Sequence, residues 1–178
     1  NTECVSHIIE KHITTDHTEN MLKSFGSEID IKKINNQTSI YVKGKKELKS
    51  VNINVPSDLS SSAFFIVAAL INKGSKISLN NININPTRDG LLKALKKMGA
   101  KISIKNQRTV SEEIVADLEV EYSNLVGCEL DAEMAKFMID EYPILSIAAA
   151  FAKGTSIFRG LKELKVKESD RLELIRLN

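Results

Sequence analysis

A short stretch close to the end of the chain carries the side chains best suited to chemistry. It reads Lys165-Val166-Lys167-Glu168-Ser169-Asp170-Arg171, with three cations and two carboxylates in seven residues. The apolar-periodic run that follows, as far as Leu177, predicts a helix. Residues three and four apart are neighbours on a helix, so Lys167, Glu168 and Arg171 would lie on or beside one face of its first turn. Free N–H groups and the positive dipole at such a place would favour an anionic substrate. A solvated charged turn is the alternative for an isolated charge run.

A further carboxylate, Asp140, directly precedes an almost wholly apolar helix predicted over residues 144–152. As a plain helix cap it would need no other role. A carboxylate at an apolar rim can also have a tuned pKa and accept a proton. The two roles are compatible, because a cap would hold the side chain in place.

The three histidines do not suggest a metal site. His7, His12 and His17 recur every five residues, a spacing that shares neither a helix face nor a strand face. They also lack carboxylate or thiolate neighbours in a metal-ligand pattern. Neither a glycine-rich phosphate loop nor a nucleophile elbow occurs, so nothing favours nucleotide binding or acyl transfer.

Composition indicates an ordinary water-soluble protein. The 178 residues are 42% hydrophobic with a formal charge of +2, which leaves no global basic field for nucleic acid. The apolar runs at 63–71 and 144–152 are far too short to span a membrane. Cys4 and Cys128 are few and far apart, as expected in a reducing compartment. The chain starts without Met and stops inside a predicted helix, so we expect it to be a piece of something larger whose targeting is not visible.

Helices and strands recur along the chain in a regular order. We predict helices at 16–25, 60–71, 90–98 and 144–152, and strands at 5–9, 28–34, 38–43, 48–55, 76–79, 100–105, 114–122, 125–129 and 155–158. The apolar helices end at Gly74 and Gly154, 80 residues apart, and the amphipathic ones at Gly26 and Gly99, 73 apart. This offset predicts an internal repeat of roughly 75–80 residues, built as compact α/β modules. The break at 55–57 predicts a domain boundary.

Five motifs, in order and spread over essentially the whole chain, resemble a known family. They are Asp16-His17-Thr18-Glu19 with Met21-Leu22 and Phe25-Gly26; Val55-Pro56 with Asp58, Ser61, Ala63-Phe64 and Ala68-Ala69; Asn85-Pro86-Thr87-Arg88 with Met98-Gly99-Ala100; Ile139-Asp140-Glu141-Tyr142-Pro143; and Glu163-Leu164 with Val166-Lys167-Glu168-Ser169-Asp170-Arg171. Together they look like 5-enolpyruvylshikimate-3-phosphate synthase, nearer the bacterial variants that are insensitive to glyphosate.

The resemblance implies an α/β (α+β) fold of two domains, each built from three βαβαββ units, with the active site between them. Only part of that fold would be present. Residues 1–55 would be the last part of the inserted domain, and residues 56–178 the first part of the domain formed by the C-terminal half.

The resemblance also implies an activity: transfer of the enolpyruvyl group of phosphoenolpyruvate to the 5-hydroxyl of shikimate 3-phosphate, with release of phosphate, in aromatic amino acid biosynthesis. Asp140 matches the family's proton acceptor, which also holds the shikimate hydroxyls, and Glu168 its candidate proton donor. Lys167 matches a residue that touches both substrates, and Arg171 a ligand of phosphoenolpyruvate. Thr15 stands where the closest members carry an arginine that contacts shikimate 3-phosphate; it offers one hydrogen bond and no charge.

On this basis we expect the two small substrates as partners, no metal or organic cofactor, and neither nucleic acid nor membrane. We expect the full-length protein to be monomeric and cytoplasmic, with a plastid location left open, and the piece alone to be inactive. One alternative is a UDP-N-acetylglucosamine enolpyruvyl transferase of the same fold, which lacks the Lys-Glu-Ser-Asp-Arg pattern. The other is a non-catalytic module that binds a phosphorylated ligand, which Thr15 would favour.

Overall fold

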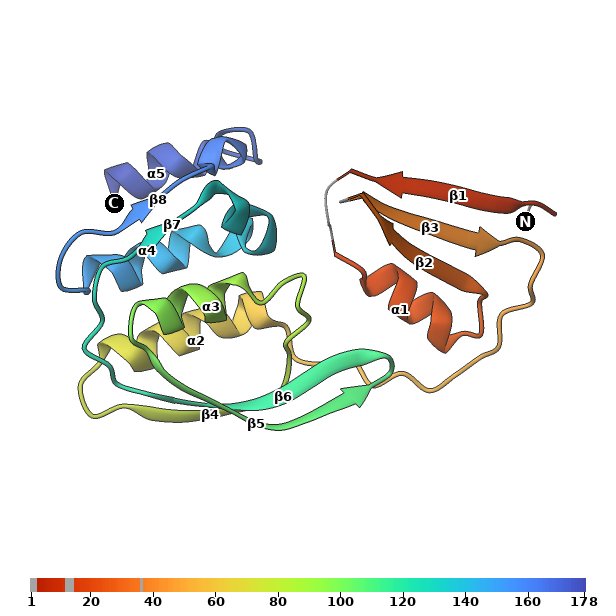
Figure 1. Ribbon diagram of the computed structural model, residues 1–178. Coiled ribbons are helices and arrows are strands. Elements are labelled where there is room, and N and C mark those ends of the chain that lie inside the picture. The colour runs from red at the N-terminus through yellow and green to blue at the C-terminus, as the bar shows by residue number, and fades with distance from the viewer. Residues whose placement is uncertain (1–2, 12–14, 36) are drawn as a thin grey trace.

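The computed structural model describes residues 3–11, 15–35 and 37–178, which form two lobes joined by an extended connection at 44–56 (Figure 1). The smaller lobe consists of β1 (Val5–Glu10), α1 (His17–Ser24), β2 (Ile29–Ile34) and β3 (Gln37–Lys43). Its three strands form an antiparallel sheet in the order β1-β3-β2. Helix α1 runs from the end of β1 to β2 and contacts the latter.

The larger lobe contains the remaining elements. They are α2 (Leu59–Ile71), β4 (Lys76–Asn83), α3 (Gly90–Lys97), β5 (Lys101–Val110), β6 (Glu113–Glu121), β7 (Glu129–Leu130), α4 (Tyr142–Ala150), β8 (Ile157–Phe158) and α5 (Arg171–Leu177), with the 3₁₀ turns η1 (Ala132–Phe137), η2 (Ile139–Glu141) and η3 (Leu161–Lys165). Strands β4, β6 and β5 form an antiparallel sheet in that order. Figure 1 shows α2 and α3 on one face of this sheet, with α4 and then α5 farther away.

Helix α2 is the centre of the core. It begins where Asp58 accepts a hydrogen bond from the backbone N–H of Ser61 at 2.8 Å, a regular N-cap. Its apolar residues contact both the sheet and α4, so Ile66 and Leu70 are fully buried. The helix is therefore buried on two sides, whereas Phe64 and Phe65 are exposed although the helix is apolar nearly all round.

The two sheets reveal the predicted repeat. The order β4-β6-β5 in the larger lobe is the order β1-β3-β2 in the smaller one. An isolated parallel bridge between Ser57 and Ile82 stands before α2, so residues 57–121 follow the order bridge, α2, β4, α3, β5, β6. The parallel pairing of β7 with β8 repeats the start of that order around α4. The mixed helix and strand fold inferred from the motifs is thus confirmed.

Two predicted strands differ in the structure. Residues 48–55 form no strand: they make up the exposed connection between the lobes, and none of them is paired with a described strand. The strand predicted at 125–129 is reduced to Glu129–Leu130 and an isolated bridge at Val126. Alternating apolar residues predict a strand only where a partner strand is available.

Strands β4 and β5 extend beyond their predicted ends. Each continues past an irregularity in its pairing with β6, between Leu79 and Ile82 and between Lys105 and Arg108. Asparagines with positive φ lie at both places, and such polar residues resemble the end of a strand in sequence. None of the helices in the described residues has the length and apolar character that a membrane crossing requires.

Candidate active site

Asp140 lies in the turn η2 and does not cap α4. The residue before that helix is Glu141, and no side chain caps the helix. The N-cap prediction for Asp140 is therefore wrong, for two physical reasons. The preceding 3₁₀ turn already bonds the backbone N–H of Glu141 to Met138, and Pro143 in the first turn has no N–H to satisfy. The side chain of Asp140 is left free to turn toward η3 and α5.

Two cations meet on one oxygen of Asp140. Arg171 Nη1 donates to Asp140 Oδ1 at 3.0 Å, and Lys167 Nζ lies 3.3 Å from the same oxygen. Lys167 also contacts Glu163 Oε1 at 3.1 Å. Hydrogen bonding to Glu163, with a smaller contribution from Asp140, raises the pKa of Lys167 above its ordinary value and keeps the ammonium charged. The structure thus joins two sequence motifs that are about thirty residues apart.

Arg171 holds Glu168 with the other edge of its guanidinium group. Nε and Nη2 donate to Glu168 Oε1 at 2.9 and 2.7 Å. This pairing lowers the pKa of Glu168 below its ordinary value, because it stabilises the ionised carboxylate. Asp140, Lys167, Glu168 and Arg171 are therefore brought together, and we call these four residues the charged cluster.

Of the three cluster residues near α5, only Arg171 lies in its first turn. Asp170 accepts a hydrogen bond from the backbone N–H of Glu173 at 2.9 Å and so starts the helix at Arg171. Lys167 and Glu168 consequently belong to the preceding turn, which corrects the expectation that they share the helix face. Glu168 pairs with Arg171 directly, and Lys167 shares Asp140 Oδ1 with it.

The turn that carries the cluster is anchored in the core. Leu164 in η3 is fully buried. Gly160, at the start of η3, has φ +79°, and a Cβ there would lie 2.6 Å from the Cβ of Ala132. Only glycine combines that left-handed backbone with so close an approach. Leu164 and Gly160 therefore fix the position of η3, the turn from which Glu163 and the following Lys167 extend.

The other candidates lie elsewhere. Thr15 is exposed at the start of α1 in the smaller lobe, and among the described residues no hydrogen bond joins it to the charged cluster. His7 stacks on Tyr41 with ring centroids 4.2 Å apart, whereas His12 lies outside the described residues. Within the part of the chain that the structure describes, no three His, Cys, Asp or Glu side chains could hold a metal ion together.

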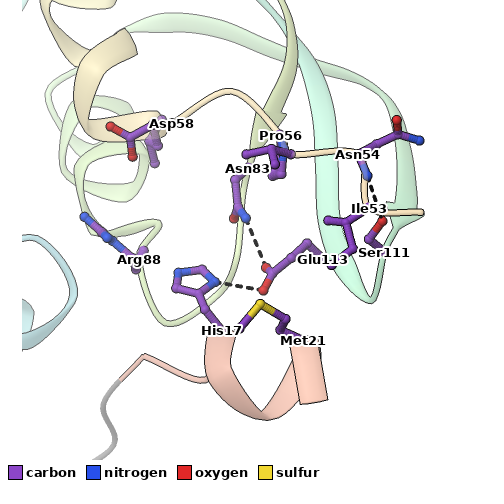
Figure 2. A pocket seen from close by; sticks show the side chains of 12 residues that line it. His17, Met21, Ile53, Asn54, Pro56, Asp58, Asn83, Arg88, Ser111 and Glu113 are labelled. Atoms are coloured by element: carbon purple, nitrogen blue, oxygen red, sulfur yellow. Dashed lines mark hydrogen bonds and ion pairs between the residues drawn. The ribbon is translucent and has the colours of Figure 1, made fainter. Parts of the chain in front are cut away.

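A pocket of about 300 Å³ lies between the lobes, apart from the charged cluster (Figure 2). Its polar centre is Glu113, which is hydrogen-bonded by His17 at 2.8 Å and by Asn83 at 3.0 Å. Burial acts to raise the pKa of Glu113, but these hydrogen bonds outweigh it and lower the pKa. Arg88 lines the pocket from the larger lobe. The carboxylate of Glu113 thus links His17 of the smaller lobe to Asn83 of the larger lobe, which is a structural role. The charged cluster is therefore the better candidate for catalysis.

Comparison with known proteins identifies the family. Residues 1–177 match the family model described as EPSP synthase (3-phosphoshikimate 1-carboxyvinyltransferase). The chain belongs to the EPSP synthase family.

Individual relatives agree with this assignment. A 3-phosphoshikimate 1-carboxyvinyltransferase from Mesorhizobium japonicum is 47% identical over 176 residues, which are 98% of this chain and 39% of that protein. Another from Cereibacter sphaeroides is 49% identical over 166 residues, or 93% and 37% of the two chains. A solved EPSP synthase structure from Acinetobacter baumannii superposes with a TM-score of 0.89 at 41% identity, covering 98% of this chain and 38% of that one. The chain thus spans about two fifths of the length of the curated EPSP synthases it matches.

Two residues of this EPSP synthase family member were quoted in the motifs without a role. Glu163 contacts Lys167, and their spacing of four residues could have indicated that pair. Glu141 is buried beneath Asp140 and contacts Ser60. No spacing rule links residues so far apart in sequence, so only the fold reveals that contact.

Proposed function

We propose that the full-length protein transfers the enolpyruvyl group of phosphoenolpyruvate to the 5-hydroxyl of shikimate 3-phosphate and releases phosphate. Family membership supports this reaction, and the observation that carries it to named residues is the pairing of Lys167 and Arg171 on one oxygen of Asp140. The reaction brings two phosphates and a carboxylate together, so cations must converge on them. It also needs a base and an acid on opposite sides of the substrates.

Each residue of the charged cluster has a role in this proposal. Asp140 accepts the proton of the attacking hydroxyl and holds the shikimate ring hydroxyls. Lys167 contacts both substrates, and Arg171 binds phosphoenolpyruvate through its planar fork of donors. Glu168 delivers a proton to the methylene carbon while the 5-hydroxyl oxygen bonds to the adjacent carbon, which gives a tetrahedral intermediate. A proton then leaves the new methyl group as the bond from carbon to phosphate breaks, which forms the enolpyruvyl group and releases phosphate. Thr15 is assigned one uncharged hydrogen bond to shikimate 3-phosphate.

The pairing of Arg171 with Glu168 suggests how substrate binding changes the protonation of Glu168, the proposed proton donor. Without substrate, Arg171 keeps the pKa of Glu168 low, and the carboxyl is ionised near neutral pH. An anionic substrate that takes over the guanidinium donors removes this stabilisation. The pKa of Glu168 then rises toward its ordinary value, and the negative charge of the neighbouring substrate raises it further, toward the range in which a carboxyl group can act as an acid.

The domain assignment and the compartment are part of the proposal. Residues 1–55 complete the inserted domain and residues 56–178 begin the other, which is consistent with a connection at 44–56 between the two lobes. We assign the protein to the cytoplasm, because the relatives compared are bacterial and both cysteines, exposed Cys4 and buried Cys128, are free. We also assign it as a monomer.

The test is Asp140→Asn in the full-length protein, with phosphate release measured in the presence of both substrates. Loss of a general base costs about 10²- to 10⁴-fold in rate, so we expect kcat to fall by that much. The matched control is Asp131→Asn, an exposed carboxylate just before η1. Turnover unchanged in Asp140→Asn would refute the assignment of the base.

The substrate that accepts the enolpyruvyl group distinguishes the proposed function from its alternatives. Phosphate release that depends on shikimate 3-phosphate supports the proposal, whereas release that depends on a UDP-amino sugar would favour the other transferase. Calorimetric binding of shikimate 3-phosphate without turnover would indicate a non-catalytic module.

A further inference from the structure

Glu141 lies next to Asp140 in the same turn, but its side chain points the opposite way. The side chain of Asp140 is 46% exposed, whereas that of Glu141 is 6% exposed. Burial raises the pKa of Glu141 above its ordinary value. A buried carboxyl group needs hydrogen-bond partners, since leaving it unsatisfied would destabilise the fold.

Those partners come from the preceding repeat unit. The hydroxyl of Ser60, in the first turn of α2, donates to Glu141 Oε1. Arg88 Nη2 donates to Ser60 Oγ at 2.8 Å and lies 3.8 Å from Glu141 Oε1. Ser60 therefore links the carboxylate to the guanidinium group, using its hydroxyl once as donor and once as acceptor. Asp58 caps α2 two residues earlier and holds this first turn in place.

This network ties η2 to a rigid helix. The turn has three residues and no side-chain cap, and the backbone N–H of Glu141 donates to the carbonyl of Met138. Asp140 is held from its other side by Lys167 and Arg171, groups that the proposed reaction requires for its substrates. When substrates take over those cations, the anchor through Glu141 remains.

We propose that Glu141 is a positioning residue: its hydrogen bond to Ser60, backed by Arg88, fixes the turn that presents Asp140 to the substrates. The inference rests on the proposed function, because it assigns a purpose to the orientation of Asp140. A positioning residue acts through geometry, so a group that keeps the acceptor oxygen should keep most of the activity. If Glu141 instead acted only through its negative charge, the neutral side chain of Glu141→Gln could not replace it.

The kinetic test compares three variants of the full-length protein with one control variant. Glu141→Ala and Ser60→Ala remove either partner of the hydrogen bond and should lower kcat/KM by about 10- to 100-fold, since small misplacements at a reacting centre have effects of that size. Glu141→Gln retains an acceptor oxygen and should recover most of this loss. Asp131→Asn controls for loss of a nearby carboxylate and should behave as wild type. Equal losses in the Gln and Ala variants would overturn the proposal.

A double-mutant cycle separates positioning from general destabilisation. Affinity for shikimate 3-phosphate is measured by calorimetry for Glu141→Ala, Asp140→Asn and the double variant. If Glu141 acts through Asp140, its replacement costs nothing further once Asp140 is changed, so the two effects are not additive. Additive losses would overturn the proposal.

A crystal structure tests the positioning role of Glu141 without relying on the proposed enzymatic activity. In a crystal structure of the full-length Ser60→Ala variant, we expect Asp140 to leave its 3.0 Å contact with Arg171 while the rest of the fold is kept. An unchanged contact would overturn the positioning role even if turnover were reduced. If the wild-type protein binds neither substrate, the proposed function fails, and this contact still decides what Glu141 does.

Discussion

Replacing Arg171 with lysine keeps the positive charge of the cluster but removes its planar fork of donors. Arg171 donates to Glu168 from two nitrogens, at 2.9 and 2.7 Å, and to Asp140 from a third at 3.0 Å. A lysine ammonium cannot reproduce this arrangement. Because the carboxylates are largely exposed, these ion pairs add little to stability, and we expect the melting temperature of Arg171→Lys to change by no more than about 2 °C.

Substrate binding should respond much more strongly. Loss of a charge-assisted hydrogen bond to phosphoenolpyruvate costs about 1.5–3 kcal/mol, which raises its KM roughly 10- to 100-fold. Arg176 provides a matched control in the same helix, because it pairs with Glu173 through Nε and Nη2 at 2.9 and 2.6 Å. Arg176→Lys should change neither KM nor melting temperature. Steady-state kinetics of both full-length variants test this, and an unchanged phosphoenolpyruvate KM in Arg171→Lys would refute the role of the fork.

Three further predictions concern pKa values and backbone strain. The folded-state pKa of Glu141 is raised, so its contribution to stability is present below its ordinary pKa and lost as pH rises through the folded value; Glu141→Gln should remove this slope in urea unfolding. Hydrogen bonds from lysines, Lys46 first, lower the pKa of Glu28 to about 2, and Lys46→Met should raise it in an NMR titration. Gly160→Ala should destabilise the protein by about 2 kcal/mol or more, and by more than Gly26→Ala, whose φ of +80° is the same but whose surroundings are open. Equal losses in thermal unfolding would contradict a steric contribution at Gly160.

Local signals predicted the elements better than the contacts between them. Helix α2 follows from its apolar run, and Ser57 and Asp58 before that run are both capping types, of which the structure uses Asp58. The strand predicted at 48–55 failed because alternation does not reveal whether a partner edge exists. Asp140 looked like a cap because the sequence does not show that a 3₁₀ turn and Pro143 already satisfy the helix start.

Sequence motifs nominated residues that lie together in the fold but did not predict their geometry, and Thr15, which was also nominated, lies apart from the other four. The motifs nominated Asp140, Lys167, Glu168 and Arg171, and the fold brings these four together. The sequence could not distinguish Asp140, which faces outward, from Glu141, which is buried beside it, because adjacent residues in an irregular turn follow no fixed periodicity.

The repeated strand order also bears on how the chain acquires its structure. Strand pairing in the smaller lobe closes within residues 5–43, and pairing around β6 closes within 76–121. Contacts that close within short stretches favour rapid folding, because little chain entropy is lost before they form. A growing chain can therefore complete one unit before the next is synthesised. Asp140 and Arg171 are synthesised after both sheets, so the charged cluster can form only after the strands of these sheets are present.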